Sequence, residues 1–237
     1  MSWILDFYRS AMGKKAVMAV TGVMLFGFVF GHMVGNLKLY QGVYASGPHA
    51  GEHKIDVYAE GLRELGAPIL GHGQALWIAR IGLLAAVLIH IHAAASLTLL
   101  SRRARPVSYA KAVPQTATYA SRTMRWGGVI ILLFVVYHLM HLTFGNVHPD
   151  FEHGRVHDNV VSGFSNPWVS GFYVAAQVAL GFHLYHGVWS LFQSLGLNGP
   201  RLNVFRRQLA AAFAVLISVA NISFPVAVLT GLVTLGG

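Results

Sequence analysis

The residues of this 237-residue sequence that could do chemistry are its histidines, of which there are 13. Ionisable side chains are costly inside a membrane and usually functional there, so histidines within long apolar segments point to buried chemistry. A neutral imidazole is a common ligand of metals, haem iron among them. Because the sequence has no cysteine, thiolate-bound iron–sulfur clusters, cysteine zinc sites, disulfides and covalently attached c-type haem are excluded. Seven histidines fall inside apolar segments: His32, His90, His92, His138, His141, His183 and His186.

Five apolar segments are long enough to cross a membrane as helices, and four of them contain histidine. A bilayer core about 30 Å thick needs about 20 mostly apolar residues in a helix. Hydrophobic residues make up 55% of the sequence and charged residues 11%, well below the roughly 25% charged residues of a soluble domain. Residues 2–13 suit a short helix in the membrane interface. We therefore expect an all-α integral membrane bundle, a single membrane domain over residues 1–237, with five transmembrane helices over 16–38, 72–100, 126–145, 168–195 and 207–234.

The charged residues indicate the orientation of this bundle. If the N-terminus lies inside, the inner segments carry twelve Lys and Arg residues and the outer segments carry four. The positive-inside rule then places the N-terminus in the cytoplasm and the C-terminus outside, in a multi-pass protein of the cell's inner (cytoplasmic) membrane. This topology accounts for the net charge of +9, so no nucleic acid is expected as a partner. The inner basic rim suits anionic membrane lipid or an acidic partner subunit.

Helix rise sorts the histidines into two layers. At 1.5 Å per residue, His32 and His138 lie about 20–25 Å from the inner ends of the first and third spans. The second and fourth spans run the other way, and His92 and His183 lie about 15 Å from their inner ends. Low-spin haem takes an imidazole on each face, and helix bundles build such sites from facing helices. The pattern therefore favours two b-type haems, one above the other.

The choice of histidine within each span stays open. His90 and His92 are two residues apart, so they point to nearly opposite sides of a helix and only one of them can face the bundle. The third and fourth spans each carry two histidines at i,i+3, which share a helix face. One member of each such pair would ligate iron, and the other would bond a haem propionate or a quinone carbonyl. These pairs are His138 with His141 and His183 with His186.

Three other features have two interpretations each. Gly27, Gly31 and Gly35 recur every four residues in the first span, and such a ridge serves either tight helix packing or the approach of a flat porphyrin. Arg80, in the outer part of the second span, either neutralises a haem propionate or snorkels to the interface. Arg125, before the third span, is either a propionate partner or a topology charge.

Haem-free interpretations use the same residues. A proton-relay transporter also has intramembrane histidines, but more often pairs them with a mid-span Asp, Glu or Lys, which the five segments lack. A tetrahedral metal site fits poorly, because the histidines lie in two layers without a nearby carboxylate. A structural anchor whose histidines bond neighbouring helices stays open.

The segments around these histidines resemble one family. They contain the strings FGHMVGN, IHAAASL, VVYHLMH and GFHLYHGVWS, and with their flanks they extend over almost the whole sequence, least in the loops at 41–71 and 146–167. In combination they are similar to the five-helix, two-haem cytochrome b subunit, of the b558 type, of succinate dehydrogenases (succinate:quinone oxidoreductases) and fumarate reductases.

The resemblance implies a set of haem ligands. Its motifs match His32 and His138, which would bind an outer haem b. They also match His92, in preference to His90, and His183, which would bind an inner haem b. The residues left to contact haem propionates are Arg80, Arg125 and His90. Candidates for the quinone site are Glu60, Glu64, His141 and His186. The alternative interpretation of the two glutamates is that they are solvated charges in a loop.

The resemblance also implies a function. Subunits of this family anchor a flavoprotein subunit and an iron–sulfur subunit on the cytoplasmic side, and serve electron transport and the tricarboxylic acid cycle. Electrons pass between succinate or fumarate and a membrane quinone, with menaquinone implied for the two-haem type. This chain has no nucleotide-binding fingerprint, so we expect no FAD or succinate site on it.

Several points stay open from the sequence. They are the direction of the reaction in vivo, the quinone species and site, any higher oligomer of the complex, and the role of the two long loops. The alternative functions are a cytochrome b anchor of another dehydrogenase, such as a hydrogenase, and a haem-free transporter or anchor.

Overall fold

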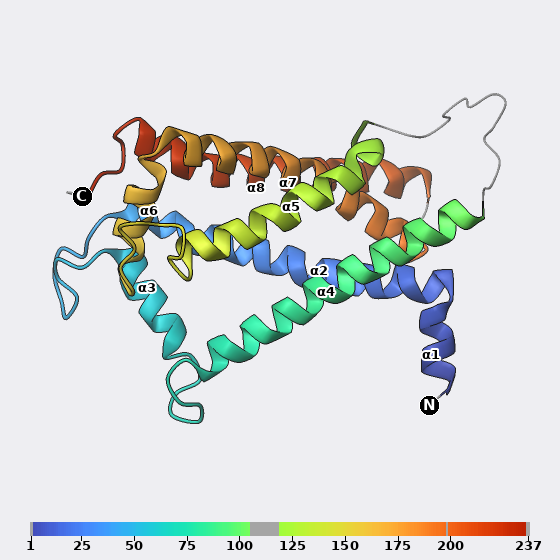
Figure 1. The fold of residues 1–237 in the computed structure, drawn as a ribbon, viewed down its shortest axis with the longest axis horizontal. Coiled ribbons are helices and arrows are strands. Elements are labelled where there is room, and N and C mark those ends of the chain that lie inside the picture. Colours follow the sequence, from blue (N-terminus) through green and yellow to red (C-terminus); the bar gives the residue numbers. More distant parts are fainter. Residues whose placement is uncertain (1, 105–118, 198, 236–237) are drawn as a thin grey trace.

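The computed structural model describes residues 2–104, 119–197 and 199–235, and within them it is helical apart from loops and two isolated β-bridges (Figure 1). The helices in chain order are α1 (Ser2–Arg9), α2 (Ala11–Asn36), the short 3₁₀ helix η1 (Leu37–Gln41), α3 (Lys54–Arg63), α4 (Gln74–Arg103), α5 (Tyr119–Leu142), α6 (Val156–Phe164), α7 (Pro167–Ser194) and α8 (Pro200–Leu229).

Four candidate membrane spans lie among the described residues, judged by length and apolar composition. They are Ala11–Gln41, which joins α2 and η1, then α4, the Met124–Leu142 part of α5, and α8. The chain is therefore an all-helical, multi-pass membrane protein. A helix lies over each of the five predicted ranges, but α7, which occupies the fourth, is not among these four candidates. The fifth transmembrane pass thus stays a prediction.

The α7 helix lies among the other long helices. It packs against α8, α5 and α2, so other helices cover several of its sides. It buries the polar side chains of Ser170 and Gln177, and Asn221 of α8 donates a hydrogen bond of 3.2 Å to the Gln177 side chain. A helix surrounded by protein does not need an apolar surface all round.

The long helices run along the molecule and leave α4 at the side (Figure 1). α4 packs mainly on α2, and α7 and α8 lie side by side. The N-terminus and α1 lie at one end, whereas the C-terminus, α3 and α6 lie at the other. A cluster of buried apolar residues joins these elements at that end. It includes Leu39 of η1, Ile55 of α3, and Val161 and Phe164 of α6.

Local sequence explains where two of the long helices begin. The Ser10 side chain accepts a hydrogen bond of 2.9 Å from the backbone N–H of Gly13, which caps α2. A Cβ at Gly13 would lie 1.9 Å from the carbonyl oxygen of Phe7, so the tight join between α1 and α2 needs glycine. Asn166 caps α7 in the same way by accepting from the N–H of Trp168, and Pro167 occupies the first turn.

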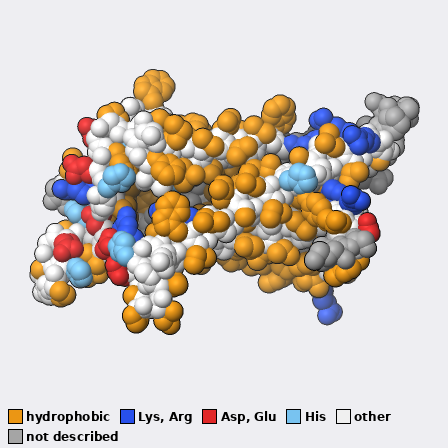
Figure 2. All heavy atoms as spheres, turned by 60° about the horizontal axis from the view of Figure 1, so that its bottom comes forward, with side chains coloured by type: hydrophobic (Ala, Val, Ile, Leu, Met, Phe, Trp, Pro, Cys, Tyr) orange, Lys and Arg blue, Asp and Glu red, His pale blue; other side chains and the backbone are white. Residues whose placement is uncertain are grey.

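The surface has the distribution expected of a membrane protein. In Figure 2, hydrophobic side chains cover the middle of the visible face, basic side chains gather at one end, and the acidic side chains and several histidines lie at the other. Large apolar side chains in the middle are exposed, among them Ile81, Leu133 and Val215. Exposed apolar surface of this extent is stable when lipid covers it.

Candidate functional site

We call the part of the bundle nearer to α3 and α6 the outer part, and the part nearer to α1 the inner part. The outer part holds one pair of imidazoles. His32 of α2 and His138 of α5 have ring centroids 5.9 Å apart and ring planes at 84°. Each is flanked by a phenylalanine one turn earlier on its own helix: Phe28 stacks on His32 at 5.4 Å, and Phe134 lies 5.6 Å from His138. Nδ1 of His138 lies 3.3 Å from the hydroxyl of Tyr173 on α7. Three helices therefore meet at this pair.

The inner part of the bundle holds a second pair. His90 of α4 and His183 of α7 have ring centroids 6.5 Å apart and ring planes at 63°. Nδ1 of His90 lies 3.1 Å from Oγ1 of Thr21 on α2, and that hydroxyl donates to the Val17 carbonyl at 2.8 Å. The hydroxyl oxygen is thus free to accept from Nδ1–H, which leaves the lone pair of His90 on Nε2. Nδ1 of His183 is buried and has no hydrogen-bond partner among the described residues.

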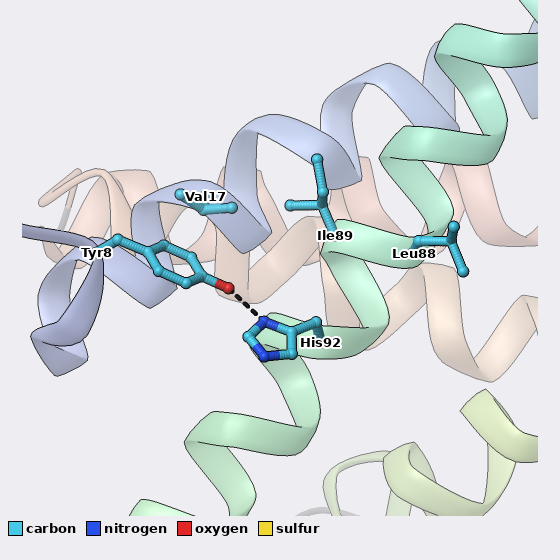
Figure 3. A pocket seen from close by; sticks show the side chains of 5 residues that line it. All are labelled: Tyr8, Val17, Leu88, Ile89 and His92. Carbon is cyan, nitrogen blue, oxygen red and sulfur yellow. Dashed lines mark hydrogen bonds between the residues drawn. The ribbon is translucent and has the colours of Figure 1, made fainter. Parts of the chain in front are cut away.

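His92 takes a different position from the one that its motif implied. Its side chain is exposed, and its Nδ1 lies 2.5 Å from the hydroxyl of Tyr8 on α1 (Figure 3). The two side chains line a surface pocket of about 540 Å³ with Val17, Leu88 and Ile89. Two residues on a helix differ by about 200° around its axis, so His90 and His92 cannot face the same neighbour. The structure brings His90, not His92, beside His183.

Both pairs fit the spacing of two imidazoles on one iron. A metal–imidazole bond is about 2 Å long, so two such nitrogens on opposite faces lie about 4 Å apart and their ring centres about 6 Å apart. The observed ring separations of 5.9 and 6.5 Å agree with this spacing. A pocket of about 250 Å³ between α5 and α7 reaches His183 and is lined by small residues that include Gly127, Ala175 and Ala179. The ring separations are therefore compatible with a haem iron between the two imidazoles of each pair.

The three glycines spaced four residues apart on α2 have two different environments. A Cβ at Gly27 or Gly31 would meet nothing within 4 Å, so this part of the ridge presents open surface beside His32. A Cβ at Gly35 would lie 2.7 Å from the hydroxyl oxygen of Tyr58 on α3, so Gly35 serves helix packing.

A family model described as the succinate dehydrogenase/fumarate reductase transmembrane subunit matches residues 101–222. The chain belongs to this family. A search of curated proteins and a search of solved structures found no match. As a transmembrane subunit of such a complex, the chain works with partner subunits in a membrane. The matched region carries His138 and His183 but neither His32 nor His90, so each imidazole pair of this transmembrane subunit has one member inside it.

The remaining histidines of the i,i+3 pairs lie beside the two sites of this transmembrane subunit. His141 is buried, and its Nδ1 lies 3.0 Å from the same Tyr173 hydroxyl that His138 approaches. Its ring also stacks on that of His148 at 4.6 Å. At the inner end, Nδ1 of His186 is buried without a hydrogen-bond partner, and its ring lies edge-on to Trp189 at 5.9 Å. Both histidines are therefore close enough to influence a site without belonging to its imidazole pair.

The charged candidates lie on the surface of the subunit. Arg80 is exposed, and its guanidinium lies 5.1 Å from the centre of the Trp77 ring, which favours an interfacial cation–π contact. Arg125 is exposed as well. Glu60 and Glu64 are exposed. Glu60 forms an ion pair with Arg63 at 3.0 Å, and Oε1 of Glu64 lies 2.6 Å from Nδ1 of His72, as expected of solvated surface charges.

Two supporting residues were absent from the sequence-based predictions. Tyr173 links the outer pair to α7, and Thr21 orients His90 from α2. Neither residue type is unusual in an apolar helix, and each contacts a histidine that is distant in sequence, so the sequence carried no signal for them.

Proposed function

We propose that this chain is the di-haem cytochrome b anchor of a succinate:quinone oxidoreductase or quinol:fumarate reductase. It would pass electrons between an iron–sulfur subunit and a membrane quinone. The observation that carries this proposal is the presence of two imidazole pairs in one bundle, at the separation that a shared iron requires.

The outer haem b would be held by His32 and His138. Haem, when bound between two imidazoles, supplies reversible one-electron transfer. His138 is oriented through its Nδ1 by the Tyr173 hydroxyl, which leaves Nε2 for the iron. The open ridge at Gly27 and Gly31 gives a flat group access to the backbone of α2.

The inner haem b would be held by His90 and His183, so His90 replaces His92 in the proposed ligand set. Thr21 orients His90 through its hydroxyl. Thr21 and His32 lie eleven residues apart on α2, which separates the two layers by about 16 Å along the helix. The same helix therefore contributes to both sites and fixes their spacing.

The proposed topology has five passes with the N-terminus in the cytoplasm. Two features support a transmembrane α7: it lies beside α8 and α5, and the chain termini lie at opposite ends of the molecule, as an odd number of passes requires (Figure 1). The basic end carries the N-terminus, so we place the flavoprotein and iron–sulfur subunits there. Oxidation and reduction of the quinone, for which we propose menaquinone, then take place within the membrane.

The decisive experiment is optical. We expect the dithionite-minus-oxidised spectrum and pyridine haemochrome of the purified complex to report two b haems per chain. His32→Ala and His183→Ala should each remove one haem. A complex without haem would overturn the electron-transfer proposal, and one haem in the parent would mean that one pair is only a packing contact. Succinate-dependent quinone reduction by the same complex excludes an anchor of another dehydrogenase.

A further inference from the structure

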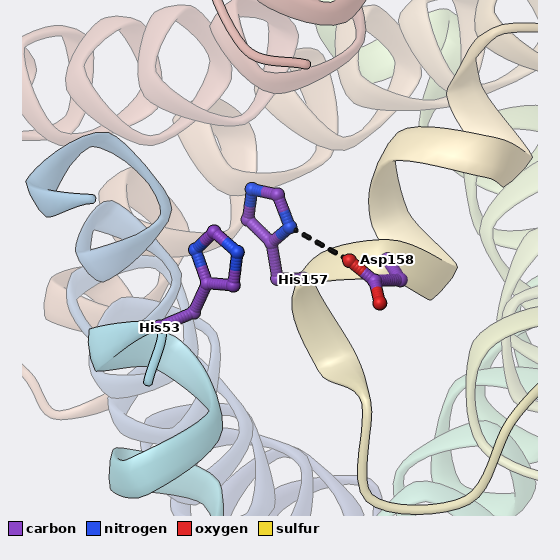
Figure 4. Close-up of side chains that lie close together, drawn as sticks. All are labelled: His53, His157 and Asp158. Atoms are coloured by element: carbon purple, nitrogen blue, oxygen red, sulfur yellow. Dashed lines mark hydrogen bonds and ion pairs between the residues drawn. The ribbon is translucent and has the colours of Figure 1, made fainter. Parts of the chain in front are cut away.

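Two histidines outside the predicted spans lie against each other at the outer end of the bundle. His53 precedes the first residue of α3, and His157 lies in the first turn of α6 (Figure 4). Their ring centroids are 3.5 Å apart and their planes differ by 6°. This contact joins the two long loops for which the sequence analysis found no role.

Carboxylates surround this histidine pair. Oδ1 of Asp158 lies 3.0 Å from Nδ1 of His157, and Oδ1 of Asp56 accepts a hydrogen bond of 2.9 Å from the His157 backbone N–H. Arg155 forms an ion pair with the second carboxylate oxygen of Asp158. One donor atom from each of His53, His157 and Asp158 lies within 4.8 Å of the other two.

Burial distinguishes this group from an ordinary surface cluster. The His157 side chain is 3% exposed and that of Asp158 is 22% exposed. Within the part of the chain that the structure describes, Nδ1 of His53 is buried without a hydrogen-bond partner. A buried nitrogen without a partner costs free energy, which a ligand at that position would recover.

The protonation states suit a cation ligand. Burial, followed by the neighbouring His157, lowers the pKa of His53, so its imidazole is neutral near pH 7 and keeps a lone pair. Burial alone would raise the pKa of Asp158, but the hydrogen bonds from His157 and Arg155 outweigh it and the net shift is downward. The group therefore presents a neutral imidazole at His53 and a carboxylate anion at Asp158.

We propose that His53, His157 and Asp158 bind a divalent transition-metal ion of the zinc type. Two imidazoles and one carboxylate form a ligand set that binds such ions in preference to Mg²⁺ or Ca²⁺. Water would complete the coordination. The ion would replace the hydrogen bond between Nδ1 of His157 and Oδ1 of Asp158 and bind to both atoms. His157 would then carry its ring proton on Nε2. Because a metal lies in the plane of the ring that binds it, the parallel rings cannot share the ion as they stand. His53 turns about its Cβ–Cγ bond, since its Nδ1 has no hydrogen bond to lose.

The ion would hold the outer ends of α3 and α6 together. The buried cluster that includes Ile55 of α3 and Val161 of α6 lies in the same region, so the metal adds a polar tie to an apolar contact. Binding to the folded chain alone would stabilise this end in proportion to the metal concentration. The site uses no residue of the proposed haem sites, so it does not depend on the proposed function.

Calorimetric titration with Zn²⁺ of the purified, EDTA-treated complex tests the site. We expect one tight site per chain that His53→Gln and Asp158→Asn weaken by at least tenfold, within the range of about 10- to 100-fold for losses around metal sites. Removing a positive charge next to the ion should tighten binding, so Arg155→Gln should bind Zn²⁺ more strongly than the parent chain. A purely structural histidine stack would not respond in this way.

The chain offers a matched control. Glu60, Glu64 and His72 form a second group with similar donor atoms, but all three are exposed. His72→Gln should leave the tight Zn²⁺ site unchanged. The proposal is wrong if the parent chain has no tight site, if His53→Gln and Asp158→Asn bind as the parent does, or if His72→Gln removes the site. Because His53 is only partly buried and Arg155 is exposed, their variants keep the test informative should Asp158→Asn fail to fold.

Discussion

At the scale of single residues, function depends on which nitrogen of each histidine already has a partner. Thr21 binds Nδ1 of His90 and Tyr173 approaches Nδ1 of His138, so both rings keep Nε2 for another ligand. A histidine oriented through its second nitrogen is the usual arrangement at metal sites. His92, by contrast, is bonded to Tyr8 at the surface. The two histidines of α4 therefore have different surroundings.

The first prediction separates these two histidines. His90→Ala should remove the inner haem, because no second imidazole would remain opposite His183. His92→Ala should retain both haems, since it loses only the contact with Tyr8. Haem content per chain and the reduced-minus-oxidised spectrum measure both variants. A one-haem His92→Ala protein and a two-haem His90→Ala protein would instead favour the ligand implied by the family motif.

The second prediction concerns Tyr173. Its hydroxyl lies within hydrogen-bond distance of His138 and His141, and Tyr173→Phe removes it. Because an acceptor at Nδ1 makes an iron-bound imidazole more electron-donating, its loss should raise the midpoint potential of the outer haem. The scale is about 60 mV, equivalent to a tenfold change in a one-electron equilibrium. Redox titration followed optically measures it. The inner haem serves as the internal control, and equal shifts of both haems would contradict a local effect.

At the scale of elements, α2 is the helix that both sites share. Its inner half meets α4 at Thr21 and His90, and its outer half meets α5 at His32 and His138. Its glycines perform different tasks along its length: Gly31 faces open surface, whereas Gly35 admits Tyr58 of α3. A regular spacing in the sequence therefore corresponds to two local environments.

The third prediction uses that difference. Gly35→Ala places a methyl group against Tyr58 and should destabilise the fold by about 1–3 kcal/mol, as overpacking does. Both variants are compared as haem-free chains, because a bound haem would lie beside Gly31. Gly31→Ala is then the matched control and should change stability by less than about 1 kcal/mol, since no described protein atom lies within 4 Å of the new Cβ. Unfolding of the detergent-solubilised protein in denaturant gives both values. Equal destabilisation by the two variants would show that the ridge acts as one packing surface.

At the scale of the whole molecule, the two ends of the bundle differ in charge and in content. The basic end lies with the N-terminus, and the acidic end carries α3, α6 and the loops that join at His53 and His157. The α7 helix runs between these ends, but it is not among the four candidate membrane spans. Whether five helices or four cross the membrane therefore depends on α7.

The fourth prediction tests the path of α7. The native chain has no cysteine, so single cysteines report without background. Ser165 lies just before α7 and Ser194 is its last residue, and both are exposed. A membrane-impermeant maleimide should label Ser165→Cys in intact cells, or in spheroplasts where an outer membrane is present, and should label Ser194→Cys only after the inner membrane is opened. Labelling of both from the same side would mean that α7 does not cross.

The sequence by itself determined the helical class, the membrane character, the family and the position of each histidine along its helix. These follow from the lengths of apolar segments, the positions of basic residues and the fixed rise of a helix. The tertiary structure alone decided which way each helix faces and which distant residues meet. Depth along a helix is a local property, but rotation about its axis is set by packing against helices elsewhere in the chain. For that reason the choice between His90 and His92, the contacts of Tyr173 and Thr21, and the meeting of His53 with His157 emerged only from the fold.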